Sequence, residues 1–278
     1  MKPGAWFALP VGLFLLVAFA APLAIVTWYS FMPARTFSLT GTPGVQNYLR
    51  AFSDGYERPL MWSLLGATLA TLVCAVLAWP TAKILHAHAG RVATIVTALI
   101  ALPIFISESV RLFGMSMFLM PRGGILAGTL DWAFGIRIGS ILNTRLAALL
   151  GLIYIHFPFM LFPTLLGVSL IPADRVEAAR DLGAGPWAVF REVELPLAAP
   201  GLLIGALLTF VLCLGANAEA AILGGRAVTV ITMSIEQRFN HAQDWPMGAA
   251  LTVLVILVTA ALVWPVLRRI DLNRIIRR

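Results

Sequence analysis

The stretch DRVEAARDLGAGPWAVFREVELP, residues 174–196, is the longest charge-rich interval between two strongly apolar segments. Its charges alternate in sign, which is typical neither of a lipid-facing helix nor of a simple basic membrane anchor. Asp174 and Glu177 stand at the spacing of a helix start, where one side chain caps the first amides and the other favours the positive end of the dipole. Gly183 accepts a left-handed turn and Pro186 suits the first turn of a second helix. The stretch therefore predicts a compact helix–turn–helix that projects from a membrane.

Physical reasoning leaves two interpretations of this helix–turn–helix open. In the first, its small residues, such as Ala178 and Ala179, form a surface that seats in the groove of a partner protein. In the second, the stretch is an ordinary cytoplasmic loop.

The spacing of the stretch also resembles the EAA loop of the membrane permeases of ATP-binding-cassette (ABC) importers. The family pattern is EAA, three residues, Gly, nine residues, Ile, one residue and Leu-Pro, and this sequence keeps every spacing, with Val193 in place of Ile. The resemblance implies a cytoplasmic coupling helix that docks in a cleft of a partner ATPase. It assigns the coupling role to Glu177, Ala178, Ala179, Gly183, Leu195 and Pro196.

The composition independently indicates a membrane protein. Hydrophobic residues make up 60% of the 278 residues, charged residues only 12%, and the mean hydropathy is +0.89. A soluble globular chain is typically about 25% charged. The net charge of +7 is divided among several loops without a basic stripe, which argues against a nucleic-acid partner. Cys74 and Cys213 both fall in apolar segments, where we interpret them as small hydrophobic residues rather than a disulfide.

The uncharged runs predict an all-α integral membrane protein, a single domain over residues 1–278 with six transmembrane helices. The first run outlasts the usual 7–15 apolar residues of a signal peptide, so we expect a retained helix. The third run is short, and we expect it to continue through Glu108 and Arg111, which are three residues apart and can pair. The approximate spans are 9–31, 61–82, 92–113, 146–171, 198–220 and 246–267, with a cytoplasmic coupling loop at 172–197.

The distribution of positive charge orients these spans. With both termini in the cytoplasm, 11 Lys and Arg residues lie inside and 9 outside, and a short basic tail at 268–278 follows the last helix. This orientation places the coupling loop in the cytoplasm, and the resemblance to the importer permeases implies a multi-pass protein of the bacterial inner membrane, surrounded by lipid. The long outer segments 32–59, 112–144 and 224–246 either dock a soluble periplasmic partner or pack over the helix ends.

The sequence carries no pattern typical of an enzyme. Neither lysine, Lys2 or Lys83, follows a Gly-x-x-x-x-Gly, so no phosphate-binding loop is expected. His86 and His88 are two residues apart and make a poor metal pair, and we interpret the lone His156 as a hydrogen-bonded packing residue. We therefore expect no catalytic residue, metal site or cofactor in this chain, and transport energy must come from another subunit or an ion gradient.

One acid within the predicted spans invites a functional hypothesis. Glu219 lies near the outer end of the fifth span, two residues after Asn217. A charge at the bilayer centre costs about 2.5–3.5 kcal/mol on insertion scales, so such acids usually face a cavity or a partner. In one interpretation Glu219 and Asn217 line the translocation path and favour a cationic solute. In the other, Glu219 lies at the interface, solvated or paired with Arg226.

Further segments resemble the spermidine/putrescine permeases within this importer family. They are Gln46-Asn47-Tyr48, Trp79-Pro80-Thr81-Ala82, Leu223-Gly224-Gly225 and Asp244-Trp245-Pro246. The resemblance implies a type I importer fold and four kinds of partner: a second permease, two ATPase subunits that hold ATP and Mg, a periplasmic solute-binding protein and membrane lipid. The implied solute is a polyamine or related amine.

A departure from the subfamily keeps other solutes open. The run Asn217-Ala218-Glu219-Ala220 replaces the usual acid, aromatic residue and proline before Leu-Gly-Gly. An opine, an osmolyte or an organic anion is therefore an alternative solute. An ion-coupled secondary transporter is a further alternative, although the sequence lacks the clear inverted repeats and multiple membrane-embedded ionisable groups typical of that class.

Overall fold

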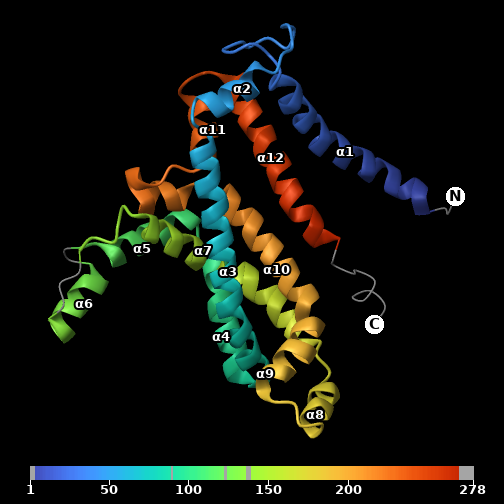
Figure 1. Ribbon diagram of the computed structural model, residues 1–278, viewed down its shortest axis with the longest axis vertical. Helices are drawn as coiled ribbons and strands as arrows, with labels where there is room; N and C mark the ends of the chain where they lie inside the picture. The colour runs from blue at the N-terminus through green and yellow to red at the C-terminus, as the bar shows by residue number, and fades with distance from the viewer. Residues whose placement is uncertain (1–3, 89, 122–123, 136–138, 269–278) are drawn as a thin grey trace. The chain divides into compact units, whose positions relative to one another are not determined.

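The computed structural model describes residues 4–88, 90–121, 124–135 and 139–268. Lys2 and all but the first residue of the basic tail at 268–278 lie outside the described residues. The described chain is almost entirely helical (Figure 1). It forms two compact units, unit 1 with residues 1–61 and 230–261, and unit 2 with residues 62–229 and 262–278.

Five helical segments in the described chain are long and apolar enough to cross a membrane, or six spans if a bent pair counts as one. Each coincides with an uncharged run of the sequence. A helix suits such a run in lipid because it satisfies its own backbone hydrogen-bonding groups. The helices are α1 (Gly4–Tyr29), α3 (Glu57–Ala87), α7 (Arg145–Ser169), α10 (Leu195–Gly215) and α12 (Trp245–Leu267). The span that contains α10 begins earlier, at Pro186.

The third predicted span is bent. It consists of α4 (Arg91–Ala101), the 3₁₀ turn η1 (Leu102–Phe105) and α5 (Glu108–Leu119), and the bend between its two halves is 106°. The bend follows a proline at 103 and an extended backbone at Ile106, with φ −98° and ψ 138°. Arg111, which the sequence suggested as a partner of Glu108, has its Nε and Nη1 buried without a hydrogen-bond partner.

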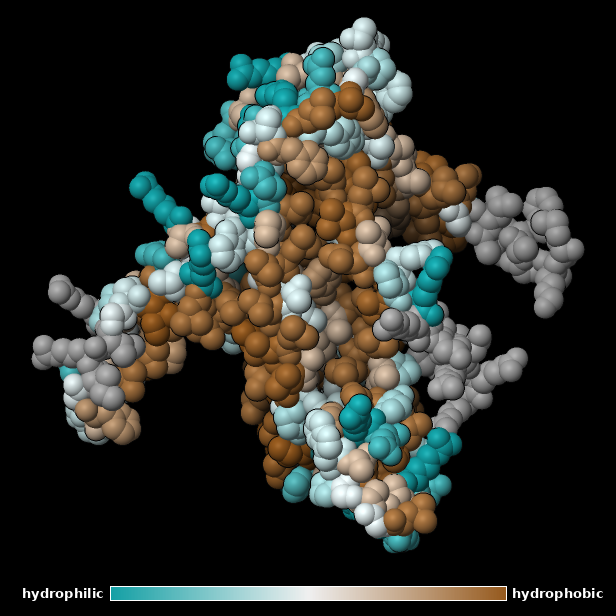
Figure 2. All heavy atoms as spheres, in the orientation of Figure 1, coloured by the Kyte–Doolittle hydropathy of each residue, from teal (hydrophilic) through white to brown (hydrophobic). Residues whose placement is uncertain are grey.

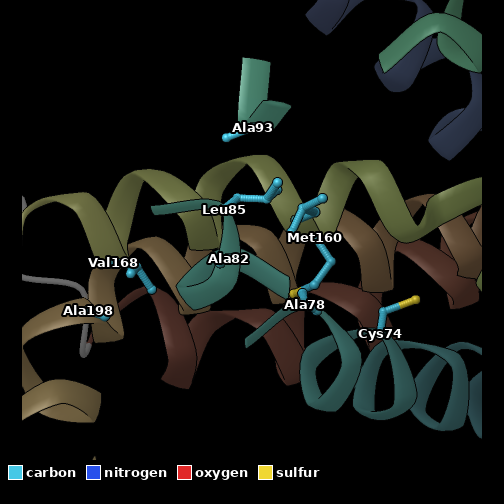
Figure 3. Close-up of a cluster of buried hydrophobic side chains, with 9 residues drawn as sticks. Cys74, Ala78, Ala82, Leu85, Ala93, Met160, Val168 and Ala198 are labelled. Carbon is cyan, nitrogen blue, oxygen red and sulfur yellow. The ribbon is translucent and has the colours of Figure 1, made fainter. Parts of the chain in front are cut away.

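The centre of unit 2 is the packing of α7 against α10. Glycines allow the two backbones to approach closely: a Cβ at Gly167 would lie 2.8 Å from the carbonyl oxygen of Ala198, and one at Gly205 would lie 2.9 Å from that of Met160. Helix α3 adds Cys74, Ala78, Ala82 and Leu85 to the same buried cluster, as Figure 3 shows. Small side chains therefore set the spacing of the three helices.

The charge-rich stretch lies at one end of the α7–α10 pair in unit 2 (Figure 1). It folds into α8 (Ala173–Asp181), α9 (Pro186–Ala188) and the π-helix η2 (Val189–Glu194), which continues into α10. The predicted helix–turn–helix is thus present. Its start differs from the prediction, because Pro172 occupies the N-cap position without a side-chain hydrogen bond and Asp174 lies in the first turn. Hydrophilic residues gather at this end, whereas apolar residues cover the helices beside it (Figure 2).

The other end of the α7–α10 pair in unit 2 is completed by shorter elements. These are α5, α6 (Ile125–Phe134), the π-helix η3 (Ala220–Gly224) and the 3₁₀ turn η4 (Gly225–Ala227). Leu112 from α5, Ile155 from α7 and Leu223 from η3 form a buried cluster there. This cluster fixes the position of the residues that come just before η3.

In unit 1, a buried aspartate organises the segments predicted to lie outside the membrane. Asp244, 1% exposed, accepts a hydrogen bond from the backbone N–H of Arg35 at 3.1 Å. The guanidinium groups of Arg50, on α2 (Gln46–Ser53), and Arg238, on α11 (Ile231–Asn240), lie 3.7 and 3.8 Å from its second oxygen. The predicted outer segments 32–59 and 224–246 therefore contain helices tied to one carboxylate.

Candidate functional site

The coupling stretch exposes most of the residues that the sequence assigned to it. Glu177, Ala178 and Gly183 are exposed, and Ala179 is half-buried. Two large apolar side chains beside them, Leu182 and Trp187, are 88% and 69% exposed. Leu195 and Pro196 lie at the start of α10 instead, with Leu195 half-buried and Pro196 exposed.

A hydrogen-bonded turn holds the end of α8 in shape. The N–H of Gly183 donates to the carbonyl of Arg180 at 2.9 Å, and the N–H of Ala184 donates to that of Ala179 at 3.0 Å. These two bonds form a Schellman motif, which needs a left-handed residue just after the helix. Gly183 supplies it with φ +84°. The glycine is therefore required by the backbone, since a Cβ there would meet no atom within 4 Å.

An ion pair that the sequence analysis missed connects α3 to the coupling stretch. Lys83 Nζ donates to both oxygens of Glu194, at 2.7 and 2.8 Å, and Glu194 is 5% exposed. One turn earlier on each side, the rings of Trp79 and Phe190 meet edge to face with centroids 5.2 Å apart. The available signal was an acid between Val193 and Leu195 of the motif, but nothing local to it identifies the partner 111 residues away.

A hollow lies beside this ion pair. Its volume is about 260 Å³, and it opens between α3 and the coupling stretch. The residues that line it are Lys83, Arg180, Ala184, Pro186, Val189 and Glu194.

The candidate path residue Glu219 is buried in unit 2. Its side chain is 1% exposed, and neither carboxylate oxygen has a hydrogen-bond partner. The nearest cationic candidate is His156 on α7, whose Nδ1 lies 3.6 Å from Glu219 Oε1 and also lies 3.0 Å from the carbonyl oxygen of Leu152. The alternative of a solvated Glu219 is wrong, because the carboxylate is enclosed. Its neighbour is the His156 imidazole, whereas Arg226 is exposed. Asn217 is half-buried.

The two sets of candidate residues lie at opposite ends of one helix. Leu195 and Pro196 begin α10, which runs for 21 residues to Gly215, and Glu219 follows four residues later. A helix of this length spans about 30 Å. The structure therefore does not bring the coupling residues and Glu219 together: α10 separates them, and an extended residue, Ala216, ends that helix before Glu219.

Side chains suited to metal binding are scattered in the described chain. No group of three or more His, Cys, Asp or Glu residues lies together there. His88, one residue after the end of α3, has its Nδ1 3.0 Å from the carbonyl oxygen of Ile84 in that helix. Cys74 and Cys213 are free and buried.

Comparisons with known proteins show the family of the chain. The family described as "Binding-protein-dependent transport system inner membrane component" matches residues 89–270. The spermidine/putrescine transport system permease protein PotB of Haemophilus influenzae is 30% identical over 220 residues, which are 79% of this chain and 77% of that one. PotB of Escherichia coli (strain K12) is 32% identical over 215 residues, 77% of this chain and 78% of that one.

A solved structure has the same fold. It is a bacterial alginate ABC transporter in complex with an alginate pentasaccharide-bound periplasmic protein. The TM-score is 0.70 at 17% identity, and the match covers 94% of this chain and 91% of that one.

Proposed function

Because the chain belongs to the family of binding-protein-dependent transport system inner membrane components, we propose that it is the permease that carries a polyamine or related amine in an ABC importer. The names of the PotB relatives support an amine solute. The single observation that carries the proposal is the enclosed carboxylate of Glu219, whose oxygens have no hydrogen-bond partner. A buried charge of this kind is costly unless it is paired, and an ammonium group is a suitable partner.

The proposed assembly contains this chain, a second permease, two ATPase subunits and a periplasmic solute-binding protein. ATP and Mg belong to the ATPase subunits, and this chain has no cofactor. The bent pair α4–α5 counts as the third of six spans in a single transmembrane domain. Both termini then lie in the cytoplasm, with the coupling stretch.

The coupling stretch is proposed to dock in the ATPase. Exposed apolar residues such as Leu182 and Trp187 support this proposal, because large apolar side chains that water would otherwise surround mark interaction sites. Glu177 sits among them on α8 and adds a charge for orientation. Movement of this stretch would reach Glu219 through α10, because the helix is continuous from Leu195 to Gly215.

The first experiment measures ATP hydrolysis by proteoliposomes that hold the whole importer and its binding protein, with and without spermidine. We expect clear stimulation by spermidine, because the loaded binding protein signals to the ATPases through the permeases. The panel also contains an opine, an osmolyte and an organic anion. Stimulation by one of these solutes, with none by any amine, would replace the amine by that solute and leave the importer function standing.

A further inference from the structure

We infer that Lys83 and Glu194, with Trp79 and Phe190, are positioning residues that fasten the coupling stretch to α3, so that movement at the ATPase reaches a second transmembrane helix. Helix α10 receives this movement directly, because η2 continues into it. Helix α3 is more than a hundred residues away in sequence and receives it only through side chains. The inference rests on the proposed docking of the coupling stretch and goes beyond it.

The two contacts form successive rungs between the same two elements. Trp79 and Lys83 are four residues apart on α3 and therefore share one face of that helix. Phe190 and Glu194 are also four apart, within the wider turn of the π-helix η2. One rung is an edge-to-face aromatic contact and the other is an ion pair. Two rungs resist rotation of η2 against α3, which a single contact does not.

The ion pair differs from an ordinary surface salt bridge. A single ammonium group donates to both oxygens of Glu194, whose carboxylate is almost fully buried. Lys83 keeps part of its side chain in solvent, with 42% exposed. Removing the cationic partner of a buried carboxylate is strongly destabilising, because an uncompensated charge is left buried. An ion pair with both side chains exposed contributes little to stability. Separation of η2 from α3 is therefore strongly disfavoured.

Open space beside the ion pair limits the packing between the coupling stretch and α3. The hollow of about 260 Å³ lies directly beside the pair and is lined by Arg180, Ala184 and Pro186 of the coupling stretch. Where space separates two elements, close packing does not transmit movement between them. The Lys83–Glu194 pair bridges this gap and adds to the packing of α3 against α7 and α10.

The test uses the whole importer in proteoliposomes and measures solute uptake per ATP hydrolysed. The variants are Lys83→Met and Glu194→Gln, each of which removes one charge, and the charge swap Lys83→Glu with Glu194→Lys. We expect each single variant to lower uptake per ATP on the order of tenfold, within the range of coupling between two sites. The swap should restore most of it. Arg91→Met is the control, because it also removes one cationic side chain but Arg91 is exposed at the start of α4, outside the coupling stretch, and it should behave like the wild type.

The pair must also act as a unit. The neutral double variant Lys83→Met with Glu194→Gln should be no worse than either single variant, because both remove the same interaction. Losses that multiply would mean that the two residues act independently, and that result overturns the inference. So would unchanged coupling in the single variants, or a swap that does not restore it. A swap that fails to assemble with the ATPase would make the pair a folding element alone and also overturns the inference.

Glu177→Arg separates this inference from the proposed function. If Glu177→Arg loses the ATPase while the Lys83 and Glu194 variants keep normal coupling, only the inference about α3 fails. If Glu177→Arg retains both the ATPase and normal coupling, the proposed docking fails instead.

Discussion

At residue 183 the backbone turns left-handed, with φ +84°, in a place where a side chain would meet nothing. The demand for glycine is therefore purely conformational. Glu219 differs from Gly183, because its side chain rather than its backbone is unusual. Glu219 has an ordinary backbone with φ −64°, but its carboxylate is enclosed and lacks a hydrogen-bond partner. Gly183 fixes the shape of the coupling stretch, whereas Glu219 places an unpaired carboxylate inside unit 2.

Substitution of Gly183 should weaken the coupling stretch in proportion to the strain of the left-handed turn. Gly183→Ala is expected to cost about 1–2 kcal/mol at the end of α8 and to reduce both ATPase co-purification and uptake. Gly183→Asn should cost less, because asparagine tolerates this conformation. Gly183→Trp should abolish coupling, and intact solute uptake by that variant would contradict the role of the turn.

Neutralising Glu219 should affect amines selectively. In Glu219→Gln we expect a marked loss of spermidine uptake, because an amide gives a cation no charge to pair with. Glu236→Gln is the control, since Glu236 is an exposed acid on α11. The measurement is the initial rate of uptake against spermidine concentration in proteoliposomes. Unchanged kinetics for the Glu219 variant would remove it from the path.

At the scale of helices, the α7–α10 pair and the segments around Asp244 are held in different ways. Glycines bring α7 and α10 together, so their contact depends on the absence of side chains. The segments of unit 1 meet around a buried carboxylate and the rings near it. Trp245 lies with its ring centroid 5.7 Å from that of Phe37 and 6.1 Å from that of Phe239. The α7–α10 packing is therefore sensitive to added side-chain volume, and the arrangement around Asp244 is sensitive to loss of the carboxylate charge.

Added volume between α7 and α10 should destabilise the fold. A side chain at Gly205 would lie 2.9 Å from the backbone oxygen of Met160, so Gly205→Leu must push the helices apart. We expect a cost of about 1–3 kcal/mol, measured as a lower Tm of the detergent-solubilised protein. Gly215→Leu is the control on the same helix, because a Cβ there has nothing within 4 Å. An equal Tm for both variants would contradict this packing.

Loss of the Asp244 carboxylate should loosen α11. Asp244→Ala removes the acceptor of the Arg35 N–H and the negative charge that lies 3.7 and 3.8 Å from two guanidinium groups. We expect a local cost of about 1–3 kcal/mol and faster hydrogen exchange of the amides of α11. Asp244→Asn keeps an acceptor for Arg35 and should exchange more slowly than the alanine variant. Wild-type exchange in both would show that the carboxylate does not organise unit 1.

At the scale of the whole molecule, the chain is the inner membrane component of a binding-protein-dependent transport system. It is a permease, almost entirely helical over its described residues, and it is similar to a transport system permease protein and to an ABC transporter structure. The described chain lays out its candidate sites along α10, with the coupling residues at one end and the buried acid beyond the other. Such a layout suits a protein in which movement of a partner at the coupling residues is transmitted along a helix toward the buried acid.

The purified chain should therefore depend on a partner for energy. We expect the affinity-purified importer to contain an ATPase and to hydrolyse ATP, and the chain purified alone to hydrolyse none, because its sequence has no phosphate-binding loop. The measurement is phosphate release together with identification of the co-purified subunits. Uptake by the chain alone, driven by an ion gradient, would favour a secondary transporter instead.

The sequence by itself determined the features that depend on neighbouring residues. Long apolar runs predict helices, because a bilayer of fixed thickness requires a self-satisfied backbone of about 20 residues. The turn at Gly183 was predictable too, since its hydrogen bonds join residues three to five apart. The spacing of the EAA pattern identified the family for the same reason: all its positions lie in one short stretch.

Only the tertiary structure decided the features that join distant residues. The Lys83–Glu194 pair links positions 111 apart and the Arg35–Asp244 bond links positions 209 apart, so neither leaves a periodic trace in the sequence. The 106° bend before α5 replaced an expected continuous span, and the enclosure of Glu219 excluded its solvation at an interface. Burial depends on which helices pack around a residue. Local patterns specify each helix, but the contacts between helices specify where a charge comes to lie.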